Sequence, residues 1–311
     1  MADRSHRAPA QRGRDTIGPS AVGIVTAPQS HPFTLRIFLP DGDPAGLRLV
    51  DKSQWTGCGL VCPRALFPAA KSREELGRAG VYVLVGPSED SDLPTIYIGQ
   101  GDPVRSRLEH HYATRDFWTW AVVFVSKDGS LNTAHVQYLE ARLIQRARDV
   151  RRANLENQNT PREPTLAEAE RMDVESFLAD MLSLLPVLGL SVFEPTPAAA
   201  AGGSALTLQS QKASARGYDS PQGFVVTAGS EAAPTSAPSA RGLLSGLRKD
   251  LLAQGVLTVE GDHLVFAQDY VFSSPSTAAG VVLGREANGR TAWKDDQGRT
   301  LREIQEAESA G

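Results

Sequence analysis

Two short groups of residues in the middle of the chain carry side chains suited to phosphate chemistry. Gly80-Val81-Tyr82 and Tyr97-Ile98-Gly99 lie on neighbouring apolar runs, and Arg107 follows eight residues after the second group. A guanidinium donates two parallel hydrogen bonds to phosphate oxygens and stays charged at any physiological pH. Cleaving a phosphodiester also requires a deprotonated water and groups that stabilise the developing charge. This spacing predicts a metal-dependent site for phosphodiester chemistry.

Three apolar runs around these residues predict a small antiparallel sheet. They span residues 81–85, 95–98 and 120–125, and β-branched side chains are frequent in them. Tyr82 and Tyr97 are then expected to project from adjacent strands toward one face of the sheet. The alternative for either tyrosine taken alone is a packing role on a half-buried strand.

A helix is predicted between the second and third strands, from Pro103 to about Tyr112. Asp102 is expected to cap it, with the proline in the first turn. Arg107 and His111 lie four residues apart and therefore share one face of this helix. The alternatives are a solvated arginine and a partly buried packing histidine.

A second helix is predicted after the third strand, with Asn132 or Thr133 as its cap and apolar side chains at helical spacing. Glu140 is expected at the edge of its apolar face. The alternative is a surface glutamate paired with Arg142 or Arg146. A third helix is predicted to begin in the capping box formed by residues 165–168 and to end before Pro186.

The order of strand, loop, strand, Arg-bearing helix and Glu-bearing helix resembles the GIY-YIG nuclease family. Gly80-Val81-Tyr82 matches the first motif, with valine in place of the usual isoleucine, and Tyr97-Ile98-Gly99 matches the second. The resemblance implies an α/β (α+β) nuclease domain with a small antiparallel three-stranded sheet flanked by helices. It also implies single-metal hydrolysis of DNA with Mg²⁺ or Mn²⁺.

Each candidate residue receives a role from this resemblance. Glu140 is the single metal ligand, and Arg107 stabilises the charge on the phosphoryl oxygens. Of Tyr82 and Tyr97, one accepts the proton of the attacking water and the other positions the water. His111 corresponds to a histidine that contributes to the site in the homing-endonuclease branch.

The family also ends its site with an asparagine that braces the pocket. Asn154, Asn157 and Asn159 compete for this role, and we choose Asn157. The alternative for Asn157 is an ordinary loop asparagine.

Composition sets only broad limits. The chain has 311 residues and a net charge of −4, but residues 105–152 hold nine Lys/Arg against five Asp/Glu, which is +4. Cys58 and Cys62 are the two cysteines, so a four-ligand zinc site would need two further ligands, and free thiols are the preferred interpretation.

No membrane association is expected, because the longest apolar stretch, near residues 182–193, is interrupted by Pro186 and Gly189. The chain opens without a charged-then-apolar leader, which predicts a cytoplasmic protein. The endonuclease is expected to be of bacterial type.

The pattern of apolar and low-complexity segments predicts six regions. They are a disordered tail (1–30), a hairpin extension (31–76), the nuclease domain (77–194), a linker (195–204), a C-terminal accessory domain (205–303) and a tail (304–311). Residues 270–279, with Asn288-Gly289 and Trp293-Lys294, resemble a DUF4357-like domain of unknown function that is often attached to such nucleases.

The C-terminal domain is expected to be α+β. A leucine-rich helix closed by Gly255 and followed by a hairpin at residues 256–266 suggests a winged-helix-like arrangement, with residues 229–240 as a low-complexity insert.

Two other functions compete with the metal-dependent DNA endonuclease. One is a non-cleaving reader of modified or damaged DNA, and the other is a protein-interaction adaptor. DNA is the expected partner, RNA is not excluded, and protein partners are unknown. An adaptor predicts no salt-dependent affinity for DNA, whereas phosphate binding must weaken steeply with salt.

Overall fold

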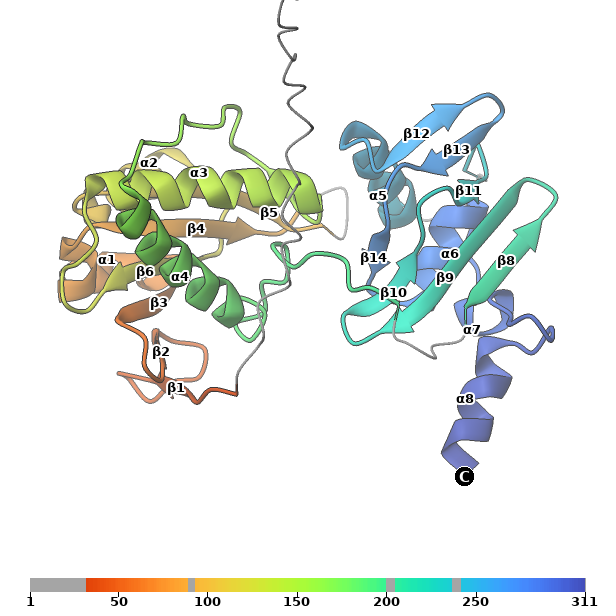
Figure 1. Ribbon diagram of the computed structural model, residues 1–311, viewed down its shortest axis with the longest axis horizontal. Coiled ribbons are helices and arrows are strands. Elements are labelled where there is room, and N and C mark those ends of the chain that lie inside the picture. Colours follow the sequence, from red (N-terminus) through yellow and green to blue (C-terminus); the bar gives the residue numbers. More distant parts are fainter. Residues whose placement is uncertain (1–31, 89–92, 200–204, 237–241, 311) are drawn as a thin grey trace, which may run out of the picture. The chain divides into compact units, whose positions relative to one another are not determined.

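The computed structural model of the chain describes residues 32–88, 93–199, 205–236 and 242–310. Two seven-stranded sheets lie in these residues, each with its own helices (Figure 1). The expectation of an α+β chain with two sheet-containing parts is therefore confirmed. The predicted disordered tail and residues 200–204 of the predicted linker lie outside the described residues.

The N-terminal part is built on a sheet of order β1-β2-β3-β6-β4-β5-β7, in which only the β5–β7 pair is parallel. Its strands are β1 (Leu35–Phe38), β2 (Arg48–Lys52), β3 (Gly57–Pro63), β4 (Gly80–Gly86), β5 (Thr95–Gly101), β6 (Trp120–Ser126) and β7 (Asn154–Leu155). Its helices are α1 (Phe67–Ala70), α2 (Val104–Thr114), α3 (Thr133–Val150) and α4 (Glu168–Leu184), with 3₁₀ turns η1 (Arg64–Leu66) and η2 (Glu74–Gly77).

The three predicted strands lie side by side in this sheet, in the order β6-β4-β5. The sheet extends beyond them because β3 joins the predicted N-terminal hairpin to β6. Glycines at two positions of β3 obscure its strand pattern. A Cβ on Gly57 would lie 2.1 Å from the indole of Trp55, and one on Gly59 would lie 3.2 Å from the ring of Phe124. These glycines therefore admit neighbouring rings rather than end the strand.

The two faces of the sheet are covered by different helices (Figure 1). Val81 and Val83 of β4 belong to the core that includes α3 and α4. Tyr82 of β4 points the other way, into the core formed with Val104 and Leu108 of α2. Alternation along one strand thus sets its valines and its tyrosine on opposite faces.

Asn132 caps α3 as predicted, and its side chain accepts a hydrogen bond of 2.9 Å from the backbone N–H of His135. The predicted Asp102 cap of α2 is wrong. Pro103 directly precedes this helix and provides no side-chain cap. The Asp102 carboxylate instead accepts a 2.9 Å hydrogen bond from the Thr133 hydroxyl, so it ties the start of α3 to the end of β5.

The predicted capping box at the start of α4 is also wrong. The helix begins at Glu168 after an extended Ala167, and no side chain caps it. Glu170 in the first turn lies 2.7 Å from His135 Nε2 on α3. This contact, which the local pattern does not reveal, ties that end of α4 to α3.

The C-terminal part contains a sheet of order β12-β13-β11-β9-β10-β14, with β8 paired to β9. Its strands are β8 (Leu206–Ser210), β9 (Ala213–Ser220), β10 (Gly223–Val226), β11 (Glu231–Ala232), β12 (Leu257–Glu260), β13 (His263–Phe266) and β14 (Tyr270–Phe272). Its helices are α5 (Gly242–Ala253), α6 (Pro275–Leu283), α7 (Gly289–Ala292) and α8 (Leu301–Ala310).

Within this part the predicted hairpin β12–β13 is present, and Gly255 follows α5 with a φ of +69°. The winged-helix suggestion is wrong, because the hairpin is the edge of a larger sheet whose other strands the sequence pattern did not indicate. Part of the predicted low-complexity insert is ordered as β11, which lies between β9 and β13, while residues 237–240 lie outside the described residues.

Across the described ranges, no helix has both the length and the apolar character that a bilayer crossing would require.

Candidate functional site

The two motif tyrosines lie on one face of the sheet because of the register between β4 and β5. Tyr82 is directly opposite Gly99, and Tyr97 is directly opposite Leu84. A Cβ on Gly99 would lie only 2.3 Å from the Tyr82 hydroxyl. The glycine of the second motif is therefore required because the side chain of the first-motif tyrosine crosses over it.

The helix α2 packs closely against Gly101 at the end of β5. A Cβ on Gly101 would lie 2.9 Å from the Val104 Cα and 3.0 Å from the Arg107 Cγ. Val104 and Leu108 are buried beneath the helix. The stem of Arg107 is thus held beside β5, while the residue as a whole is exposed.

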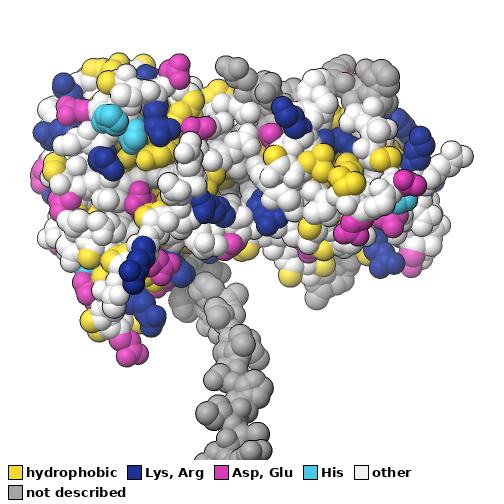
Figure 2. Space-filling view, turned by 90° about the horizontal axis from the view of Figure 1, so that it is seen from above, with side chains coloured by type: hydrophobic (Ala, Val, Ile, Leu, Met, Phe, Trp, Pro, Cys, Tyr) yellow, Lys and Arg dark blue, Asp and Glu magenta, His cyan; other side chains and the backbone are white. Residues whose placement is uncertain are grey.

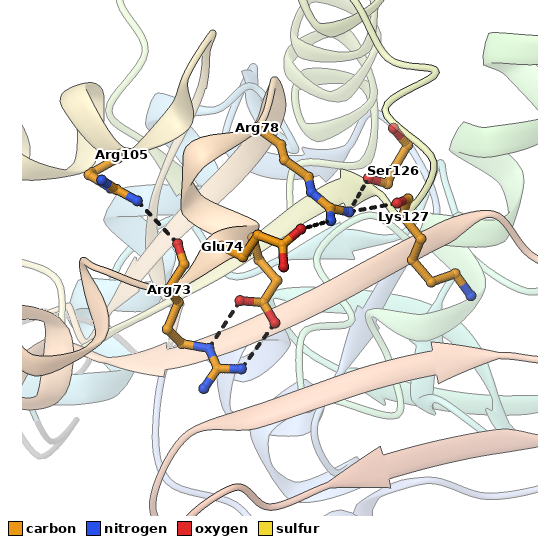
Figure 3. Close-up of polar contacts among 7 residues, drawn as sticks. Arg73, Glu74, Arg78, Arg105, Ser126 and Lys127 are labelled. Carbon is orange, nitrogen blue, oxygen red and sulfur yellow. Dashed lines mark hydrogen bonds and ion pairs between the residues drawn. The ribbon is translucent and has the colours of Figure 1, made fainter.

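A network of charged residues fixes the N-terminal end of α2 (Figure 3). The carbonyl of Arg78 accepts a 2.9 Å hydrogen bond from the backbone N–H of Val104. Its guanidinium donates to the carbonyls of Ser126 and Lys127 at 2.9 and 2.8 Å, and it also pairs with Glu74. Arg78, two residues before β4, therefore links α2 to the end of β6.

Arg105 strengthens the same network from inside α2. Its guanidinium donates a 3.2 Å hydrogen bond to the carbonyl of Arg73, whose own side chain makes a bidentate pair with Glu75 at 3.1 and 3.0 Å (Figure 3). Charge-assisted bidentate pairs of this kind have restricted geometry. This pair orders the segment before β4, and the hydrogen bonds from Arg105 and Val104 tie the helix that carries Arg107 and His111 to that segment.

Tyr82 and His111 form a buried pair behind the site. The Tyr82 hydroxyl lies 2.8 Å from His111 Nε2, and the two residues are 1% and 6% exposed. Burial, and next the neighbouring Tyr97, raise the pKa of Tyr82 far above its usual range. Burial, followed by the charge of Arg115, lowers the pKa of His111 to about 4. Both side chains are therefore neutral at physiological pH, and Tyr82 is poorly suited to accept a proton.

Tyr97 occupies the more accessible position of the two tyrosines. It is half-buried, its ring centroid is 4.8 Å from that of His111, and the Arg115 Cζ lies 4.3 Å from its centre. A hollow of about 560 Å³ opens beside it, and Tyr97, Arg115, Glu140, Glu156 and Asn157 contribute to its lining. The histidine and the arginine hold the phenol ring at the wall of this hollow.

Glu140 and Arg107 bring opposite charges to this region from α3 and α2. Burial raises the pKa of the half-buried Glu140 to about 7, and the positive charge of Arg107 opposes this shift. Within the described residues, neither side chain has a hydrogen-bond or ion-pair partner. The carboxylate and the guanidinium are thus free to bind ligands, although Arg107 does not line the hollow itself.

The alternative pairing of Glu140 with Arg142 or Arg146 is wrong. Arg142 lies 3.1 Å from Glu175 on α4, and Arg146 donates a 2.6 Å hydrogen bond to the carbonyl of Phe193. Both arginines are thus engaged by other groups, while Glu140 lines the hollow.

Asn157 makes two hydrogen bonds to a single residue of β5. Its Oδ1 accepts from the backbone N–H of Ile98, and its Nδ2 donates to the carbonyl of Ile98, both at 2.8 Å. Asn159 is exposed, and Asn154 lies in β7, paired with Thr95. Of the three asparagines, Asn157 has the geometry to brace the strand that carries Tyr97.

Arg115 and Glu156 are members of the site that sequence analysis missed. Arg115 directly follows α2, and its Nη1 lies 3.4 Å from the Glu156 carboxylate. The signal was available, because Arg115 follows His111 by four residues, as His111 follows Arg107. The spacing of four residues therefore continues from Arg107 and His111 on α2 to Arg115 at its C-terminal cap position.

The donor set fits a hard divalent cation that keeps most of its hydration. A single half-buried carboxylate with no protein partner is such a ligand, since Mg²⁺ is often held by one or two carboxylates together with waters and substrate oxygens. In the part of the chain that the structure describes, no cluster of three or more His, Cys, Asp or Glu forms a closed site. Cys58 and Cys62 are free thiols, and burial raises their pKa to about 11 and about 12, so a zinc site gains no support.

Comparison with known proteins bears on the C-terminal part alone. Searches of curated proteins and of solved structures found no match to this chain. No family model supports a GIY-YIG domain in the N-terminal part, so that assignment depends on the motifs and on the geometry above. Residues 206–305 match the family described as a domain of unknown function (DUF4357). The chain therefore contains a DUF4357 domain, as the resemblance of its C-terminal residues implied.

Proposed function

We propose that the N-terminal part is a Mg²⁺- or Mn²⁺-dependent DNA endonuclease of the GIY-YIG type. One observation carries this proposal. Among the described residues, Glu140 on α3 and Arg107 on α2 are both without protein partners, they lie within electrostatic range of each other, and both lie beside β5, the strand that carries Tyr97. A free carboxylate, a free guanidinium and a phenol are the groups that single-metal phosphodiester hydrolysis needs.

Arg107 binds the scissile phosphate, and Glu140 binds the metal ion. The Arg107 guanidinium donates hydrogen bonds to the non-bridging oxygens of the scissile phosphate and offsets the charge that builds on them. Glu140 holds the cation through its carboxylate. When bound, the cation supplies a second positive charge at the phosphate and acidifies a coordinated water.

Tyr97 and Tyr82 have different roles in this proposal because they differ in burial. Tyr97 lines the hollow, where it orients the attacking water, accepts the water's proton and releases its own proton to solvent. As the water oxygen bonds to phosphorus, the bond from phosphorus to the leaving sugar oxygen breaks, and that oxygen takes a proton from solvent. Tyr82 stays protonated and buried, and with His111 it fixes the position of the Tyr97 ring. Asn157 holds the backbone on which Tyr97 is mounted.

DNA is the substrate that the charge distribution supports. Figure 2 shows basic side chains interspersed with acidic ones on the face in view, so affinity must come from local contacts rather than from a uniformly basic surface. Residues 105–152, which include the end of α2, carry the local excess of +4. The DUF4357 domain is proposed as an accessory domain that adds contacts to DNA.

The test is cleavage of supercoiled plasmid and of branched DNA with Mg²⁺ or Mn²⁺. Glu140→Gln and Arg107→Ala are expected to abolish metal-dependent nicking. Their matched controls are Glu109→Gln, on the exposed surface of α2, and Arg171→Ala, on the exposed surface of α4, and both should cut as the native chain does. No cutting by the native chain under any condition, with DNA still bound, would favour the non-cleaving reader instead.

A further inference from the structure

We propose that Arg115 is a second phosphate-binding residue, which engages a flanking phosphate of the strand whose scissile phosphate is held by Arg107. This inference depends on the proposed function for its substrate, although its test does not depend on cleavage. Arg115 was not part of the motif set, and its position at the wall of the hollow is what brings it into the site.

Helical geometry separates the two arginines by a useful distance. Eight residues at a rise of about 1.5 Å each place their backbones on the order of 12 Å apart along α2. One strand of duplex DNA carries a phosphate about every 3.4 Å of helix axis, so this separation covers roughly three phosphates. This backbone separation allows the two guanidinium groups to bind different phosphates rather than compete for one.

The Arg115 guanidinium is held against Tyr97 and makes only a weak ion pair, with Glu156. Its Cζ lies 4.3 Å from the centre of the Tyr97 ring, which is a cation–π contact. Within the described residues its one ion pair, to Glu156, is long at 3.4 Å, and 31% of the side chain remains exposed. A guanidinium has five N–H donors in a rigid fork, so stacking on the phenol leaves several donors at its edge for phosphate oxygens.

Glu156 is the group that a phosphate would displace from Arg115. Its side chain is 46% exposed and makes no closer contact than 3.4 Å with Arg115. A phosphate that binds in a bidentate manner forms shorter and stronger charge-assisted hydrogen bonds than this exposed pair. Binding of DNA is thus expected to replace the Glu156 contact while Arg115 stays stacked on Tyr97.

The experiment measures the salt dependence of DNA binding, with a short duplex, EDTA and a titration of NaCl. Arg115→Gln should reduce the slope of log K against log [NaCl] by about 0.9, the value for one lost phosphate contact on duplex DNA. Arg115→Lys keeps the charge and should keep the native slope. Arg171→Gln on α4 is the matched control, and Glu156→Gln should tighten binding because it removes the competing carboxylate.

The outcomes separate this inference from the proposed function. An unchanged slope in Arg115→Gln overturns the inference even if the native chain cuts DNA. A reduced slope, restored in Arg115→Lys, supports it even if no cutting is found. A native chain without salt-dependent affinity for DNA overturns both proposals. Thermal unfolding of each variant shows whether a lost slope reflects lost structure.

Discussion

Glu140→Gln is expected to stabilise the metal-free protein at alkaline pH, although it removes the proposed metal ligand. Burial raises the pKa of this carboxyl from its ordinary 4.5 to about 7. Because the folded-state pKa lies above the unfolded value, the protonated acid favours the folded state fully below pH 4.5. That contribution is lost as the pH rises through about 7.

The size of the effect follows from the shift. A difference of 4.5 to about 7 corresponds to about 3 kcal/mol at about 1.36 kcal/mol per pKa unit. The carboxylate is only half-buried, and solvent screening reduces this upper bound to about 1–2 kcal/mol. Glutamine keeps the shape of the side chain and carries no charge at any pH, so its stability should lack this pH dependence.

The assay is urea unfolding of both proteins at pH 5 and pH 8, without divalent cations. Tryptophan fluorescence reports mainly on the N-terminal part, because Trp55, Trp118 and Trp120 lie there and Trp293 does not. The stability of Glu140→Gln relative to the native chain should rise by about 1–2 kcal/mol between the two pH values. If the two proteins differed in unfolding free energy by the same amount at pH 5 and pH 8, the conclusion that burial destabilises the Glu140 carboxylate would be refuted.

Three further predictions concern the same site. Adding Mg²⁺ at pH 8 should stabilise the native chain and leave Glu140→Gln unchanged, as measured by the unfolding midpoint. Gly99→Ala should destabilise the protein by roughly 2–4 kcal/mol in urea unfolding, because its Cβ would lie 2.3 Å from the Tyr82 hydroxyl. Asn157→Ala should lower the free energy of unfolding by about 1–3 kcal/mol, because it leaves the Ile98 backbone N–H without its partner. Asn159→Ala, at an exposed position, should have no effect. Equal losses in both variants would count against a bracing role for Asn157.

The strands at the centre of the first sheet could be predicted because their sequence signal is local. Residues 81–85 and 95–98 are rich in β-branched side chains, and the tyrosine of each motif sits at a fixed place in that alternation. The register that sets Tyr82 over Gly99 then follows from antiparallel pairing. The candidate site was accessible for the same reason, since its tyrosines, Arg107 and His111 all lie on these strands and the next helix.

Other features depend on contacts between distant segments, which local patterns do not carry. β3 was missed because Gly57 and Gly59 are there to admit the rings of Trp55 and Phe124. Asp102 resembles a helix cap, but a hydroxyl from α3 binds its carboxylate.

The proposed division of roles between the two tyrosines was likewise invisible in the sequence. The motifs treat them alike, and only the fold shows that α2 and His111 bury Tyr82 while Tyr97 lines the hollow. Burial decides their chemistry, because a phenol without access to solvent and with a raised pKa does not take up the proton of a water.

The central claim is that Glu140 and Arg107 form a phosphodiester-cleaving site, and metal-dependent nicking of supercoiled plasmid tests it most directly. The native chain and Glu109→Gln should convert the plasmid to nicked or linear forms in Mg²⁺ or Mn²⁺ and not in EDTA. Glu140→Gln, folded as shown by its unfolding curve, should leave the plasmid supercoiled. Equal nicking by Glu140→Gln, or none by the native chain, would contradict the claim.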